Sequence, residues 1–170
     1  MIMSKQILFC VETNSKAETD KVYINETISN YYDLGNNIRI RFICFEGKGN
    51  YKKKDILKKI ADQVRQYRAI GPTYVVYCID TDRYDADPVH LRELDEIKNY
   101  CDQQGYDLIW FCRDVEDVYW GEQIHKDEKT RMAIKFRSSR QILNVEDQNL
   151  RGEDLARHKS NILQVLDKYL

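Results

Sequence analysis

The chain has 170 residues, of which 42% are hydrophobic and 32% are charged, with only seven glycines and two prolines. This composition excludes collagen-like, low-complexity and broadly disordered proteins, and the length suits one domain. The formal net charge is -1, so no overall positive field draws the chain to nucleic acid or anionic lipid, and such binding needs a local basic patch.

Hydrophobic runs and cysteines limit where the chain is expected to work. No apolar run approaches the roughly twenty residues of a membrane-spanning helix, and the short run before Glu12 lacks a signal-peptide cleavage site. The five cysteines are widely spaced, with no CxxC pair and no histidine at zinc-ligand spacing. We therefore expect free, buried thiols in a cytoplasmic protein without a membrane partner.

Four short runs rich in β-branched and aromatic residues are predicted as strands. They cover residues 6–12, 38–45, 73–79 and 107–112. Three of these runs are continuously apolar, which is typical of strands covered on both faces of a sheet. The run at 38–42 alternates between apolar and charged residues instead, so we expect that strand at a sheet edge.

Amphipathic stretches between these runs predict helices. They cover residues 19–34, 52–70 and 88–104. Asp87 is a good N-cap, Pro88 suits a first helical turn, and Gly105 favours a helix end. The order βαβαβαβ predicts parallel strands joined by right-handed crossovers. The sequence therefore predicts a doubly wound α/β fold, with a mainly parallel four-stranded sheet and helices on both faces.

Residues 113–170 are more polar and are predicted to be helical. A basic helix is expected over 128–139 and an apolar one over 154–170. No internal repeat or Pro/Ser-rich linker separates this part from what precedes it. We therefore interpret 1–112 as an α/β core and 113–170 as a helical extension packed on that core, in a single domain.

Acidic residues follow three of the four predicted strands at their carboxyl ends. Glu12 ends the first strand, Asp80 and Asp82 follow the third, and an acidic run containing Glu116 follows the fourth. In an open parallel sheet these ends meet at one edge, which is where ligands bind. Residues two apart in an extended chain face the same side, so Asp80 and Asp82 are expected to present their carboxylates side by side.

Clustered carboxylates repel one another and need a compensating charge. For oxygen ligands the usual partner is a hard cation, Mg²⁺ or Mn²⁺, and such sites support phosphodiester cleavage. We therefore interpret Glu12, Asp80 and Asp82 as candidate metal ligands. The alternative is that the Asp-x-Asp pair serves a turn or caps a helix, both of which aspartate favours.

These residues resemble the Toprim family, in which a Glu closes the first strand and Asp-x-Asp closes the strand two further on. Toprim domains occur in topoisomerases, primases and overcoming-lysogenization-defect (OLD) nucleases. The nearer resemblance is to the small RloB-like branch of bacterial defence and restriction loci. The matching segments are Glu12-Thr-Asn-Ser-Lys-Ala-Glu18-Thr-Asp-Lys-Val-Tyr23, Glu46-Gly-Lys-Gly-Asn-Tyr51, Ile79-Asp-Thr-Asp82 and Glu116-Asp-Val-Tyr-Trp120.

The resemblance implies a Mg²⁺-dependent nuclease that cleaves RNA or DNA, in phage defence, with a partner such as a defence-system ATPase. It implies that Glu12 is the acid/base or first metal ligand, that Asp80 and Asp82 hold Mg²⁺, and that Glu116 is an additional catalytic acid. Thr13 replaces the family's Gly, and the family's Ser-Asn-Pro-x-Phe run is also replaced. These departures support one alternative, a non-catalytic Toprim-like module that binds protein or nucleic acid. A second alternative rests on the Asp-x-Asp motif itself and is an enzyme that processes nucleotides or phosphates.

Basic residues near the strand ends are candidate nucleic-acid contacts. Lys16 and Lys48 lie close to predicted strand ends, and Lys52 and Lys53 begin a basic helix. Such side chains bind phosphate backbones regardless of base sequence. The alternative is that they form a solvated helix face. The sequence leaves open whether the substrate is DNA or RNA, and which oligomer forms.

Overall fold

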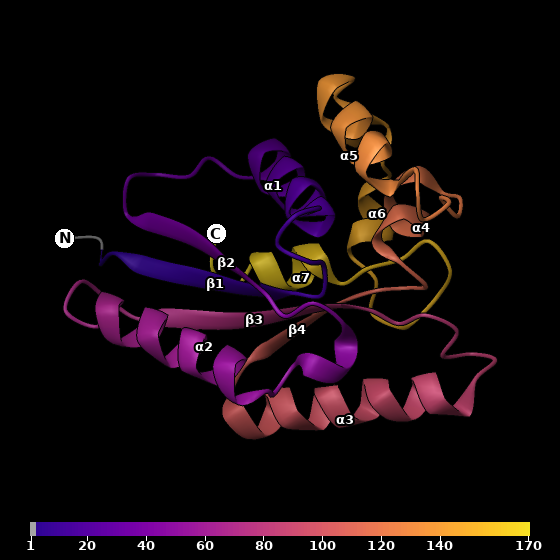
Figure 1. The fold of residues 1–170 in the computed structure, drawn as a ribbon. Coiled ribbons are helices and arrows are strands. Elements are labelled where there is room, and N and C mark those ends of the chain that lie inside the picture. Colours follow the sequence, from indigo (N-terminus) through magenta and orange to yellow (C-terminus); the bar gives the residue numbers. More distant parts are fainter. Residues whose placement is uncertain (1–2) are drawn as a thin grey trace.

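The computed structural model describes residues 3–170 and contains a parallel sheet flanked by helices (Figure 1). Its strands are β1 (Lys5–Val11), β2 (Ile38–Cys44), β3 (Thr73–Asp80) and β4 (Asp107–Phe111). Their order across the sheet is β2-β1-β3-β4, and each neighbouring pair is parallel. The parallel order and the flanking helices confirm the predicted doubly wound α/β fold. Each strand end also lies within about one residue of its expected position.

The two edges of the sheet are β2 and β4. The edge position predicted for residues 38–42 is therefore confirmed. The free side of β4 is covered by the C-terminal segment, in which the Asn161 side chain mimics a strand. Its amide oxygen accepts a hydrogen bond from the Trp110 N–H at 2.9 Å, and its amide nitrogen donates to the Leu108 carbonyl at 2.9 Å. These bonds pair backbone groups that an open edge would leave free.

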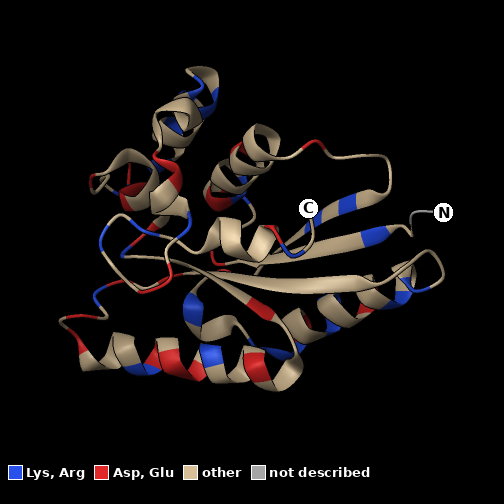
Figure 2. Ribbon diagram, turned by 180° about the vertical axis from the view of Figure 1, so that it is seen from behind, with Lys and Arg blue, Asp and Glu red and all other residues tan. Residues whose placement is uncertain are grey.

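Three long helices form the crossovers between successive strands. They are α1 (Thr19–Tyr31), α2 (Lys54–Tyr67) and α3 (Pro88–Gln104), with a 3₁₀ turn, η1 (Lys48–Asn50), before α2. In Figure 1, α2 and α3 lie together on one side of the sheet and α1 lies on the other. Lysines and arginines are frequent along α2, as Figure 2 shows.

The ends of α3 are those that the sequence predicts. The Asp87 carboxylate accepts a hydrogen bond from the Val89 N–H at 2.9 Å, which makes Asp87 the N-cap, and Pro88 occupies the first turn. Gly105 ends the helix with a positive φ of 68°, a conformation that glycine adopts without strain. The helices α1 and α2 are shorter than predicted, since they end at Tyr31 and Tyr67.

Beyond β4 the chain forms short helices rather than long ones. They are α4 (Val115–Trp120), α5 (Lys129–Ser138), the 3₁₀ turn η2 (Gln141–Asn144), α6 (Asp147–Leu150) and α7 (Ile162–Leu166). The basic helix predicted over 128–139 is confirmed as α5. The helix predicted over 154–170 is wrong in its first half, because residues 154–161 are irregular and Ser160 forms an antiparallel bridge with Phe111.

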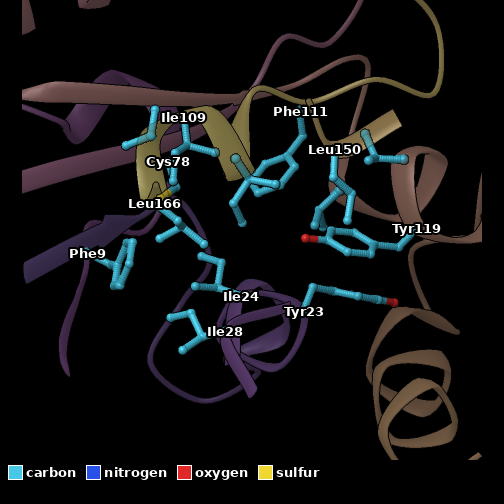
Figure 3. Packing of buried hydrophobic residues seen from close by; sticks show 14 of the residues in the cluster. Phe9, Tyr23, Ile24, Ile28, Cys78, Ile109, Phe111, Tyr119, Leu150 and Leu166 are labelled. Atoms are coloured by element: carbon cyan, nitrogen blue, oxygen red, sulfur yellow. The ribbon is translucent and has the colours of Figure 1, made fainter. Parts of the chain in front are cut away.

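The C-terminal helices share a hydrophobic core with the sheet and α1 (Figure 3). The Tyr23 ring of α1 stacks on Tyr119 of α4, with ring centroids 5.1 Å apart, and Phe136 of α5 packs edge-on at 4.8 Å from Tyr23. Phe9 of β1 and Leu166 of α7 belong to the same cluster. Residues after 112 are thus joined to the α/β layer by continuous apolar packing, which stabilises both parts together.

The burial of most of the thiols agrees with the expectation from the sequence. Cys10 and Cys78 are buried, Cys44 is half-buried, and all five cysteines are free. Burial raises the pKa of the Cys112 thiol to about 11, so this thiol is protonated at neutral pH. Within residues 3–170, no helix is long and apolar enough to span a bilayer.

Candidate active site

The candidate site lies at the carboxyl ends of β1 and β3, which are neighbours in the sheet. The register pairs Val11 with Cys78, and this places Glu12 beside the end of β3. The Asp80 N–H donates a hydrogen bond to Glu12 Oε2 at 3.1 Å, and Asp80 Oδ1 accepts one from the Val115 N–H at 3.0 Å. The structure therefore brings together Glu12, Asp80 and the start of α4, as the strand order predicts.

Asp82 does not lie beside Asp80 in the way the sequence predicts. The strand ends at Asp80, and Asp82 adopts a left-handed conformation with φ of 52°. The extended geometry assumed for the Asp-x-Asp pair is therefore wrong. Between the two aspartates, the Thr81 hydroxyl accepts a hydrogen bond from the Arg113 N–H at 2.9 Å, which fixes the turn. Asp82 forms an ion pair with Lys48 of η1.

Asp20 is a member of the site that the sequence analysis missed. It lies in the first turn of α1 and is only 4% exposed. Burial, followed by the charges of Glu116 and Glu12, raises its pKa to about 8, although the Thr13 N–H donates to it. Glu18 is the other acidic residue between Glu12 and Tyr23 in the segment that resembles the Toprim motif, but its side chain is 45% exposed and pairs with Lys21 at 3.3 Å. Asp20 lies within the matched segment, three residues before Tyr23, and this position was the signal in the sequence that could have identified it.

Glu116 joins the same group from the first turn of α4, where it is 1% exposed. Lys129 of α5 donates to Glu116 Oε2 at 2.7 Å and to Asp114 Oδ2 at 3.1 Å. Although burial lowers the pKa of Lys129, these carboxylates and Asp80 raise it well above its usual range. Sequence reasoning missed Lys129, because the basic run over 126–140 gives no sign of which residue faces inward.

We call Glu12, Asp20, Asp80 and Glu116 the acidic cluster. Removal from water raises the pKa of all four carboxyl groups. The charges of Asp20, Glu12 and Glu116 raise the pKa of Asp80 further, and Lys48 lowers that of Glu12. Each member thus opposes the ionisation of another, so the cluster either holds protons or requires added positive charge.

The donor chemistry of the acidic cluster fits a hard divalent cation, because every candidate ligand is a carboxylate oxygen. One of these atoms, Glu116 Oε1, is buried without a hydrogen-bond partner in the described part of the chain. In the same residues, 3–170, no three histidine, cysteine or acidic side chains are already arranged as a metal site. The ammonium groups of Lys48 and Lys129 supply the positive charge in this arrangement.

A cleft of about 580 Å³ lies next to the cluster and is lined by both acidic and basic residues. Asp82 and Asp114 line it together with Arg83, Arg113 and His90. Arginine forks bind phosphate oxygens in bidentate fashion, so the cleft offers anion-binding groups next to the carboxylates. Arg113 also contacts Asp85 at 3.5 Å.

The other predicted basic residues fall into two groups. Lys48 is 7% exposed and contacts Asp82, so it belongs to the site. Lys16, Lys52 and Lys53 are exposed, and the Lys52 ammonium lies 5.4 Å from the centre of the Tyr51 ring. These three side chains are placed outside the acidic cluster and contact solvent.

Comparison with known proteins assigns no family. No model of a known protein family matches the chain, and no curated protein matches it significantly. What the chain does must therefore be argued from the acidic cluster, the adjacent cleft and the two lysines.

Proposed function

We propose that this chain is a Mg²⁺-dependent nuclease of the Toprim type that hydrolyses phosphodiester bonds in RNA or DNA. The observation that carries the proposal is that Glu12 contacts the end of β3 at Asp80, where the charges of Asp20, Glu12 and Glu116 also raise the pKa of Asp80. Carboxylates that raise one another's pKa are costly to fold, and such groups mark functional sites. The Toprim resemblance rests on two of the same residues, Glu12 and Asp80.

The acidic cluster would hold the cation through its carboxylate oxygens. When bound, Mg²⁺ would neutralise the cluster and polarise a phosphoryl oxygen. The candidate ligands are Glu116 Oε1, which lacks a partner among the described residues, and the carboxylates of the half-buried residues Glu12 and Asp80. Asp82, which is paired with Lys48 and 42% exposed, is the weakest candidate of the predicted set.

The residues around the cluster would bind the substrate and move a proton. Arg83 and Arg113 in the cleft would hold phosphate oxygens beside the carboxylates. Burial raises the pKa of Glu12, which favours this carboxyl group as the one that accepts a proton from water or returns one to the leaving oxygen. Lys48, next to Asp82 and Glu12, would stabilise negative charge on the phosphorus centre.

A phage-defence role and a partner ATPase belong to the same proposal and rest on the RloB-like resemblance alone. The test is whether expression of the chain protects a bacterial host from phage, with and without a neighbouring ATPase gene. Protection that persists in Asp80→Asn would contradict a nuclease-dependent role.

The nuclease test compares wild type with Asp80→Asn on single- and double-stranded RNA and DNA, with Mg²⁺, Mn²⁺ or a chelator. Asparagine keeps the side-chain oxygen that accepts from the Val115 N–H, so folding should be retained. We expect cleavage only with the divalent ion and a loss of about a hundredfold or more in the variant. Asp95→Asn, an exposed change on α3, is the matched control. Equal cleavage by Asp80→Asn would refute the assignment.

A second candidate is a non-catalytic binding module, and the lysine ion pairs favour it. Lys129 holds Glu116 and Asp114, so part of the acidic charge is balanced by the protein itself. Titration calorimetry separates the two candidates, since a nuclease site must take up Mg²⁺ or Mn²⁺ and a lysine-neutralised module need not. The divergence of Asp80 and Asp82 gives no support to an Asp-x-Asp nucleotide-processing enzyme.

A further inference from the structure

A second groove lies between α2 and α3, on the sheet face opposite α1. Its volume is about 630 Å³. Leu57 and Val64 of α2 line one wall, and both are more than one-third exposed. The aromatic rings of Tyr100 and Tyr106 line the opposite side. The groove therefore presents exposed aliphatic side chains beside two half-buried tyrosines, whose rings also pack on Tyr77 of the core, at a place that the acidic cluster does not use.

The charge of this groove is positive. Arg65 and Arg68 line it, and no acidic residue does among those that the structure describes, although Arg65 also pairs with the neighbouring Asp62 at 2.6 Å. The neighbouring groove, between α3 and β4, is the reverse, because Asp95, Asp102 and Asp107 are among its lining residues. Tyr106 lies between the two grooves and borders both. An anionic ligand that needs aromatic contact is therefore expected to bind in the α2/α3 groove, because the aspartates of the other groove would repel it.

A line of lysines joins the groove to the candidate active site. Lys48 contacts Asp82 at the site, and the exposed Lys52, Lys53 and Lys54 follow at the start of α2. From Lys54 to Arg65 the helix rises about 17 Å. Figure 2 shows this series of basic positions along α2. The spacing suits a few nucleotides of extended backbone, whose phosphates would contact one basic residue after another.

We propose that the α2/α3 groove binds unpaired bases of a single-stranded nucleic acid whose backbone continues along α2 to the acidic cluster. The inference rests on the proposed function, which it deepens by naming single strands as the substrate class. Unpaired bases stack on aromatic side chains while arginines contact their phosphates, whereas a duplex keeps its bases inside. An acidic protein segment would also match the groove, but nothing would draw it along the lysines towards the carboxylates.

Fluorescence anisotropy in a chelator tests the binding without cleavage. The probes are labelled oligothymidine and oligouridine strands of about twelve nucleotides, a hairpin duplex of equal length, and an acidic leucine-containing peptide. The variant is Arg65→Ala with Arg68→Ala, both exposed, and the control is Arg92→Ala with Lys98→Ala on α3. The two pairs remove equal charge from neighbouring helices, so a difference between them reports position. Tyr106→Leu, compared with Tyr106→Phe, tests stacking.

We expect the single strands to bind more tightly than the duplex. The double variant Arg65→Ala with Arg68→Ala (the groove pair) should weaken single-strand binding about tenfold. It should also reduce the slope of the logarithm of the binding constant against the logarithm of salt concentration by about 1.4, which corresponds to two phosphate contacts. The control pair should have a much smaller effect, and Tyr106→Phe should bind more tightly than Tyr106→Leu. Equal losses in both pairs, a preference for the duplex, or tighter binding of the peptide would overturn the inference. Cleavage assays test the nuclease proposal separately. If the wild type cleaves with Mg²⁺ but the groove pair binds single strands with unchanged affinity, the role of the groove is refuted and the nuclease proposal is not.

Discussion

Replacing Asp20 by asparagine should stabilise the protein, and the gain should grow as pH rises. The native pKa of Asp20 is raised from 3.8 to about 8, by burial first and then by Glu116 and Glu12. Between these two values the native state holds a proton that the unfolded chain has released, so the free energy of unfolding falls with increasing pH. The asparagine side chain is neutral at every pH, and its oxygen can still accept from the Thr13 N–H.

The size of the effect follows from the pKa shift. A shift of about four pH units corresponds to a limit of about 6 kcal/mol, which is approached at pH 8 and above. Glu12, Asp80 and Glu116 also titrate in this cluster, so we expect the substitution to recover about half of that limit, or about 3 kcal/mol. For a chain of this length, that gain corresponds to an increase in Tm of about 6–12 °C.

The assay is thermal and urea denaturation at pH 5, 6, 7 and 8 in a chelator, followed by circular dichroism. The variant should gain most at pH 8 and progressively less towards pH 5, because the native carboxyl group is already protonated there. Asp95→Asn, on the exposed face of α3, should change little at any of these pH values. An Asp20→Asn protein that is no more stable than wild type at pH 8, or that gains equally at pH 5, would refute the account of the acidic cluster.

Three further substitutions test other parts of the structure by urea denaturation. Lys129→Met leaves Glu116 buried without its cation and should lower the free energy of unfolding by about 2–4 kcal/mol, with partial recovery when Glu116→Gln is added. Asp87→Ala removes the α3 N-cap and should lower it by about 1 kcal/mol. Gly71→Ala places a Cβ in direct overlap with the Ser4 carbonyl oxygen, and the forced shift should lower it by about 1–3 kcal/mol.

Matched controls accompany these three changes. They are Lys126→Met, which alters an exposed lysine near α5, Asp33→Ala, which alters an exposed aspartate after α1, and Gly49→Ala, whose Cβ would meet no described atom within 4 Å. Each control should lie within about 0.5 kcal/mol of wild type. A control that destabilises as much as its partner would show that the named contact is not the cause.

The sheet and its order could be predicted from the sequence because apolar runs and crossover lengths determine them. The adjacency of Glu12 and Asp80 followed from that order, since parallel strands bring their carboxyl ends to one edge. The predicted pairing of Asp80 with Asp82 failed because the chain turns at Thr81, whose hydroxyl accepts from the Arg113 N–H. A strand-to-loop transition of this kind depends on contacts with β4 that no local pattern displays.

Asp20 and Lys129 were missed for a related reason. Asp20 lies in the first turn of a helix recognised only by its apolar face, Lys129 lies in a basic run, and both face inward where α1, α4 and α5 pack together. The irregular segment before α7 was likewise hidden, because its apolar residues fit a helical period although its backbone pairs with β4. Tertiary contacts override local preference at these positions.

The covering of β4 by Asn161 has a consequence for how this protein can fail. While the C-terminal segment stays in place, Asn161 occupies the Trp110 N–H and the Leu108 carbonyl, so a second molecule cannot form hydrogen bonds with these two groups. Removal of that segment by proteolysis or truncation would expose the backbone groups of the apolar edge Leu108–Trp110. The β4 strands of two chains could then pair edge to edge and form fibrillar or swapped assemblies. The segment around Asn161 therefore occupies backbone groups of the β4 edge, besides contributing Ile162 and Leu166 to the core.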